Sequence, residues 1–177
     1  EWSCRIPLFI DIPGVSPVRV DTPVSLLDVP ATLINITGQV PVRPMEGRSL
    51  LPAVHGAELE VVPVISEYHG EGIMRPSFIV RLGDWKYHYC HGTKARMFNI
   101  VEDPGEWIDR SGETELSEIE GELDQIITGG YFDLKKIAKD VWDRLPMKQV
   151  VNNAMETNDT RWDYQVDPSA STQFVRS

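Results

Sequence analysis

The chain has 177 residues, 41% of them hydrophobic and 25% charged, and its formal net charge at pH 7 is −10. Those values are typical of one globular domain, or of a small core with appendages. The negative charge argues against nucleic acid as a partner, because binding it needs clustered Lys and Arg to neutralise phosphates. No apolar run approaches the roughly 20 residues of a membrane span, so no membrane partner is expected either.

The start of the chain is expected to be a buried strand. Residues 5–10, RIPLFI, form a short apolar run that leads into a Pro-Gly turn. A strand so close to Glu1 predicts that the chain is the C-terminal portion of a longer protein. No signal peptide is visible, and Cys4 and Cys90 indicate thiols in a reducing compartment, with a single disulfide as the alternative. We therefore expect a cytoplasmic protein.

Helices are expected on both sides of a group of strands. Asp21 or Thr22 is the predicted N-cap of a first helix that ends at Gly38, and Pro30 should kink or split it. Apolar residues at helical spacing predict further helices over 49–56, 115–128 and 133–145, the last broken by Pro146, and a final helix over 147–156.

Strands are expected in the middle of the chain. Apolar and alternating stretches predict strands at 61–68, 78–82, 85–90 and 95–100, with a Gly83-Asp84 hairpin turn between the second and the third. Neighbouring strands of this kind predict a small antiparallel sheet. Together with the helices they place the chain in the α/β class.

One strand end carries possible metal ligands. His88, Cys90 and His91 lie close together, and a soft metal could use them. In a strand, however, His91 faces away from the other two, and no second cluster is spaced to complete a zinc site. A strand end of mixed polarity is therefore the favoured interpretation.

A second strand end carries alternating acidic and imidazole side chains. In the stretch SEYHGEG, Glu67, His69 and Glu71 share one face if the strand is extended. They could line a carboxylate-rich pocket wall or form a solvated strand end, and spacing alone favours the second. No G-x-S-x-G, C-x-x-C or H-E-x-x-H pattern occurs, so the chain holds no complete active site of its own.

Several stretches, taken in order along almost the whole chain, resemble the sulfatase family of the alkaline-phosphatase-like superfamily. The segment VDTPVSLLDVPATLINITG resembles that family's V-S-x-x-D-x-x-P-T pattern, and MEGRSLLPAV resembles its D-G-R-S-L-L-P segment, with Glu46 in place of Asp. The stretches GDWKYHYCHG and ARMFNIVEDPGEWID resemble its W-K-Y strand and its D-P-x-E turn. The resemblance implies the C-terminal part of a sulfatase fold, with a small antiparallel sheet, packed helices and an extended C-terminal tail.

Within that family, SEYHGEG and the ending RWDYQ resemble the choline-sulfatases. That resemblance implies hydrolysis of choline-O-sulfate to choline and sulfate, with the tail in homo-oligomer contacts. It also implies a divalent metal, calcium in most members, and a formylglycine nucleophile. Cys4 has the wrong spacing for the formylglycine motif, so both the metal ligands and the nucleophile are expected outside this chain.

The hypothesis for the substrate head rests on four residues. Choline has no N–H to donate, so aromatic faces and carboxylates recognise it. Trp162, Asp163 and Tyr164 offer those groups side by side, and Glu67 adds negative charge. The alternative for Trp162 and Tyr164 is that they anchor the tail to a partner subunit.

Three regions and two rival functions follow from these comparisons of motifs. We expect residues 1–60 to end the large α/β domain, residues 61–157 to form a C-terminal subdomain, and residues 158–177 to form the tail. One rival is another sulfatase or a phosphonate or phosphate monoester hydrolase of the same superfamily. The other is a non-catalytic binding or oligomerisation module.

Overall fold

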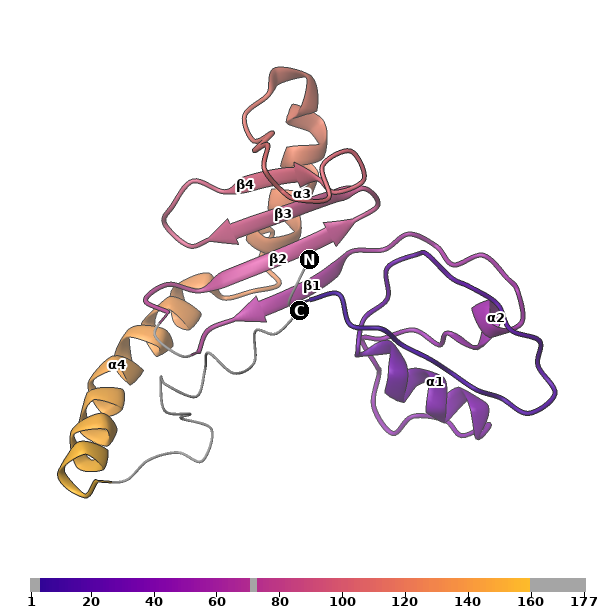
Figure 1. Ribbon diagram of the computed structural model, residues 1–177, viewed down its shortest axis with the longest axis horizontal. Helices are drawn as coiled ribbons and strands as arrows, with labels where there is room; N and C mark the ends of the chain where they lie inside the picture. The colour runs from indigo at the N-terminus through magenta and orange to yellow at the C-terminus, as the bar shows by residue number, and fades with distance from the viewer. Residues whose placement is uncertain (1–3, 71–72, 160–177) are drawn as a thin grey trace, which may run out of the picture.

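A computed structural model describes residues 4–70 and 73–159 (Figure 1). Its centre is a four-stranded antiparallel sheet in the order β1-β2-β3-β4. The strands are β1 (Val64–Tyr68), β2 (Ser77–Leu82), β3 (Trp85–Cys90) and β4 (Arg96–Asn99). This confirms the predicted small antiparallel sheet, including the hairpin turn at Gly83, whose φ of 54° suits a glycine.

The core lies between one face of this sheet and α3 (Ser117–Thr128), which follows a short 3-10 turn (Thr114–Leu116). Alternate residues of β2 and the i, i+4 residues of α3 point to this layer, as the two periodicities require. The fully buried cluster consists of Phe78, Val80, Tyr87, Met97, Leu123 and Ile127. The mixed α/β class with a small antiparallel sheet and packed helices is therefore confirmed.

The last helix, α4 (Leu134–Thr157), differs from the prediction. It runs for 24 residues with Pro146 inside it, so the expected break into two helices is wrong. A proline removes one helical hydrogen bond, but the turns on either side keep theirs. Asp133 caps the start by accepting from the backbone N–H of Lys136 at 3.0 Å.

The N-terminal part contains two helices, α1 (Asp28–Ile36) and α2 (Leu51–Val54), and lies beyond the β1 edge of the sheet (Figure 1). The short helix at 49–56 is confirmed, and Gly38, with φ of 66°, ends α1 as predicted. The predicted start at Asp21 or Thr22 is wrong. Because α1 begins at Asp28, Pro30 lies in its first turn, where the missing N–H costs no bond, and no kink is needed.

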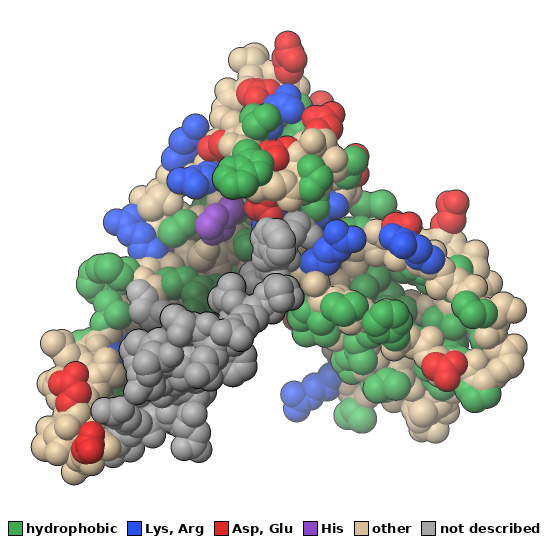
Figure 2. All heavy atoms as spheres, viewed as in Figure 1, with side chains coloured by type: hydrophobic (Ala, Val, Ile, Leu, Met, Phe, Trp, Pro, Cys, Tyr) green, Lys and Arg blue, Asp and Glu red, His purple; other side chains and the backbone are tan. Residues whose placement is uncertain are grey.

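The predicted strand over residues 5–10 is also wrong, since no strand precedes β1 among residues 4–70. A strand needs a neighbour to bond its backbone, and an apolar run alone does not supply one. Ile6 and Phe9 leave 62% and 90% of their surface exposed. Figure 2 shows further apolar side chains gathered over the lobe that carries α1 and α2.

None of the helices in the described part of the chain combines the length and the apolarity that crossing a bilayer requires.

Candidate functional site

The candidate site joins the N-terminal lobe to the segment that follows α3, and a buried aspartate organises that lobe. Asp28 is 5% exposed. Its two carboxylate oxygens accept from the backbone N–H groups of Ser25 and Arg48, each at 2.8 Å. A carboxylate that accepts two backbone donors is well satisfied in the interior. Asp28 therefore holds the loop of residues 46–49 against the start of α1.

Thr32, one turn further along α1, also joins this helix to the segment that follows residue 46. Its hydroxyl donates to the backbone carbonyl of Asp28 at 2.7 Å and accepts from the backbone N–H of Leu50 at 2.8 Å. Gly47 allows the close approach, because a Cβ there would lie 1.9 Å from the carbonyl oxygen of Leu27. The two sequence segments that carry these residues are thus one structural unit, and it places Glu46 at the edge of the lobe.

Glu46 reaches across to the sheet side of the molecule. The Tyr131 hydroxyl donates to Glu46 Oε1 at 2.7 Å, which joins residues 85 positions apart in the sequence. Tyr131 follows Gly130, whose φ of 101° turns the chain sharply after α3. This hydrogen bond raises the pKa of Tyr131, and the negative charges of Glu46 and Glu67 raise it further.

Glu67 lies at the end of β1 and is exposed, as one of the two interpretations of that stretch requires. One of its carboxylate oxygens is 2.9 Å from His69 Nε2. The His69 ring meets Phe78 edge-on with centroids 4.9 Å apart. His69 therefore ties the carboxylate to the aromatic part of the core and limits the directions in which Glu67 can point.

A row of rings connects Glu67 with Tyr131. Phe78 packs on Phe132 with a centroid distance of 4.8 Å, and Phe132 meets Tyr131 edge-on at the same distance. Tyr131 leaves 68% of its surface exposed. The Tyr131 ring thus has the Glu46 carboxylate on its hydroxyl, and the charge of Glu67 at the end of β1 also acts on it. Carboxylates together with an exposed aromatic ring suit an organic cation.

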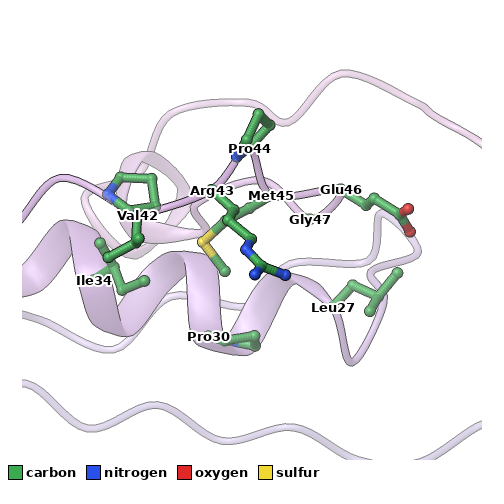
Figure 3. Close-up of a pocket in the computed structure, with 10 residues that line it drawn as sticks. Leu27, Pro30, Ile34, Val42, Arg43, Pro44, Met45, Glu46 and Gly47 are labelled. Atoms are coloured by element: carbon green, nitrogen blue, oxygen red, sulfur yellow. The ribbon is translucent and has the colours of Figure 1, made fainter.

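A groove with a volume of about 590 Å³ lies elsewhere, between α1 and the loop of residues 41–47. Figure 3 shows Arg43 and Met45 pointing from this loop toward the helix that carries Pro30 and Ile34, whereas the Glu46 carboxylate points away. Its walls are mostly apolar. Glu46 also lines this groove, but its carboxylate turns away from the groove and accepts from the Tyr131 hydroxyl.

Known proteins are similar to this chain. No model of a protein family matches it. A choline-sulfatase from Rhizobium meliloti (strain 1021) is 33% identical over 189 residues, which cover 100% of this chain and 36% of the relative. An arylsulfatase K from Danio rerio is 28% identical over 180 residues, which cover 97% of this chain and 32% of the relative. The solved structure of a 2-O GAG sulfatase aligns with a TM-score of 0.50 and 25% identity, over 67% of this chain and 26% of that one.

The chain belongs to the sulfatase family. It spans about a third of the length of the curated relatives that it matches. The likeness to solved sulfatases places its fold in the alkaline-phosphatase-like group. The family resemblance that the V-S-x-x-D and E-G-R-S segments indicated is therefore confirmed, and the structure shows that these two segments pack on each other.

Of the four residues predicted to bind the substrate head, one lies in the part of the chain that the structure describes. Glu67 lies at the end of β1, as described above. Trp162, Asp163 and Tyr164 lie outside the described residues, and their assignment stays a prediction. Tyr131 was not predicted, because the pattern around it indicated only the end of the helix over 115–128. The available signal was an aromatic residue directly after the two glycines, Gly129 and Gly130.

The His88 stretch shows no sign of a metal site. His88 Nε2 is 2.8 Å from the Ser77 hydroxyl on the neighbouring strand, and His91 Nδ1 is 3.1 Å from the Tyr89 hydroxyl. Among residues 4–70 and 73–159, no group of three or more His, Cys, Asp or Glu side chains could hold a metal ion. The described residues therefore do not fit the divalent metal that the family implies.

Acid should destabilise the sheet through His88. Burial lowers the pKa of His88, and the positive charges of Lys86 and Arg96 lower it further, against an opposing effect of Glu106. Between this lowered pKa and the ordinary value of about 6.5, the unfolded state binds the proton more readily, so stability falls as the pH falls. As the pH is lowered through this window, the melting temperature of the wild type should fall more steeply than that of His88→Gln. Parallel melting curves at every pH would contradict this.

Proposed function

We propose that the chain is the C-terminal part of a sulfuric-ester hydrolase of the choline-sulfatase type. The reaction is hydrolysis of choline-O-sulfate to choline and sulfate. The observation that carries the proposal is the exposed Glu67 carboxylate at the end of β1, held by His69. The His69 ring is connected through Phe78 and Phe132 to the exposed Tyr131 ring. The similarity to a choline-sulfatase over the whole chain supports it.

In this proposal the chain recognises the substrate head and the reaction centre is supplied from elsewhere. A quaternary ammonium ion attracts carboxylates and aromatic faces, with about 0.5–2 kcal/mol for each cation–π contact. Glu67 supplies charge, and Trp162, Asp163 and Tyr164 of the tail complete the pocket. We place the metal, which we take to be calcium, and the formylglycine nucleophile outside the chain.

The experiment compares two substrates in the complete protein that contains this chain. Glu67→Gln removes the charge and keeps the shape. We expect kcat/KM for choline sulfate to fall about 10- to 100-fold, because an opposite charge near the ammonium is lost. For a neutral aryl sulfate we expect little change. Asp163→Asn should show the same pattern if the tail belongs to the pocket.

Glu122→Gln is the matched control, since it removes one negative charge from the exposed surface of α3. It should leave both substrates unaffected and so separate local charge recognition from the effect of net charge. Equal losses on both substrates in Glu67→Gln would remove the proposed role in charge recognition.

A second candidate is a sulfatase that acts on a substrate without a cationic head. The specific observation in its favour is the similarity to an arylsulfatase K, which covers 97% of the chain. A preference of the wild type for neutral sulfate esters over choline sulfate would select this candidate.

Assembly and location complete the proposal. We place the homo-oligomer contacts in residues 158–177 and the protein in the cytoplasm, where thiols such as Cys90 persist. A truncation after Asp159 should then lower the oligomer mass measured by light scattering, and an unchanged mass would count against the tail contact.

A further inference from the structure

A hydrogen bond joins the N-terminal lobe to the segment after α3, and it bears on which substrate is chosen. Tyr131 and Glu46 come from loops that are far apart in the sequence, and 2.7 Å separates the hydroxyl from the carboxylate oxygen. The E-G-R-S loop is held by Asp28, and the core cluster around Phe78 and α3 is complete without the exposed Tyr131 ring.

We infer that Tyr131 is a specificity-determining residue whose ring forms a wall of the cation pocket, and that Glu46 is a positioning residue that holds this ring. The inference rests on the proposed function, since it concerns the same pocket as Glu67. It adds a wall that comes from the described residues and does not depend on the tail.

The geometry supports this assignment in three ways. The Tyr131 ring is exposed, so a ligand can reach it, and the edge-on contact with Phe132 supports it from the side. The hydroxyl donates to Glu46, which holds the side chain in one position. The row of rings through Phe132 and Phe78 ends at His69, whose partner is Glu67.

Electrostatics point in the same direction. The negative charge of Glu67 contributes to raising the pKa of Tyr131, together with the larger effect of Glu46. Two carboxylates thus act on one phenol from different sides of the molecule. A small organic cation beside the ring would meet both an electron-rich face and negative charge, whereas a neutral group would gain only the apolar contact.

The test uses tetramethylammonium as an inhibitor of neutral aryl sulfate hydrolysis by the complete protein. Tyr131→Leu removes the ring and should raise the inhibition constant about 3- to 30-fold, the range of a cation–π contact. Tyr131→Phe keeps the ring but loses the tether, so a smaller rise of about 2- to 5-fold is expected.

Glu46 is tested by rescue. Glu46→Leu removes the acceptor and should weaken inhibition as Tyr131→Phe does. Glu46→Gln keeps a carbonyl oxygen that can accept from the hydroxyl and should recover most of the effect. A role for Glu46 in stability alone would change melting temperature without this difference between the two variants.

Tyr68→Leu is the matched control. Tyr68 is 51% exposed and follows Glu67 directly, but strand alternation turns it to the opposite face of the sheet. Tyr68→Leu should leave inhibition by tetramethylammonium unchanged. Thermal melting checks that each variant is folded, and Tyr131→Phe keeps the test open if Tyr131→Leu does not fold.

The outcomes distinguish this inference from the proposed function. If tetramethylammonium inhibits the wild type and Glu67→Gln weakens that inhibition, but Tyr131→Leu does not, the role of Tyr131 is overturned and the cation pocket stands. If tetramethylammonium does not inhibit the wild type at all, both are overturned. Loss of inhibition in Tyr131→Leu and Glu67→Gln, with Tyr68→Leu unaffected, supports both.

Discussion

Replacing Lys86 by Met is expected to lower the free energy of unfolding by about 3–5 kcal/mol. Lys86 is buried in β3, and its ammonium group lies 2.8 and 2.7 Å from the two carboxylate oxygens of Glu106. The side chains are 7% and 19% exposed. Without Lys86, the partly buried Glu106 carboxylate would lose its main opposite charge, and the loss of this pairing is the source of the destabilisation.

The pair can be tested by denaturant unfolding of the single and double variants. Lys86→Met with Glu106→Gln should recover much of the loss, because no buried charge is then left alone. A double variant as unstable as the single one would show that packing, and not charge, causes the effect. That outcome would remove the ion pair as the source of the stability.

The same pair should make the protein sensitive to acid. Burial alone would raise the pKa of Glu106, but the hydrogen bonds and the charge of Lys86 outweigh it and hold this pKa below the ordinary value. A carboxyl group with a lowered folded-state pKa contributes stability at neutral pH, and this is lost as the pH falls through that value. The contribution of Lys86 should therefore shrink in strong acid.

Gly47→Ala is expected to destabilise the N-terminal lobe by about 1–3 kcal/mol. The new Cβ would lie 1.9 Å from the carbonyl oxygen and 2.2 Å from the carbonyl carbon of Leu27, both of them backbone atoms that cannot move aside alone. The loop would have to shift away from α1. The hydrogen bond from the backbone N–H of Arg48 to Asp28 would then lengthen or break.

Gly121→Ala is the matched control for this substitution. Gly121 lies within α3, and a Cβ there meets nothing within 4 Å. The same change should therefore stabilise the protein by up to about 1 kcal/mol, since alanine is the better helix former. Thermal or denaturant unfolding of both variants should give opposite signs. Destabilisation of equal size in both would contradict the close contact at Gly47.

Regular patterns in the sequence predicted the sheet well. Alternation in residues 78–82 and 85–90 and the glycine turn between them specify a hairpin locally, because a strand pair with a short turn needs only neighbouring residues. The prediction of a strand at the start of the chain was wrong for the opposite reason. The apolar run of residues 5–10 has the composition of a strand. A strand forms only where another segment bonds to its backbone, and the residues of the run do not specify such a partner.

The two helical prolines show the same limit of prediction from local sequence. Pro30 and Pro146 were both expected to disturb a helix. The first does no damage because the helix begins two residues before it, and the second lies inside a helix that continues past it. The effect of a proline depends on its position relative to the helix start, and the boundary was the uncertain part of the prediction.

The family resemblance, the small antiparallel sheet and the exposed carboxylate of Glu67 at a strand end could be predicted from the amino-acid sequence. These depend on short segments whose order and spacing can be read directly. How the segments meet became visible in the folded chain, with Asp28 joined to the E-G-R-S loop, Lys86 to Glu106, and Tyr131 to Glu46. Each contact joins residues 20 or more positions apart, and such pairs are selected by the packing of the whole chain.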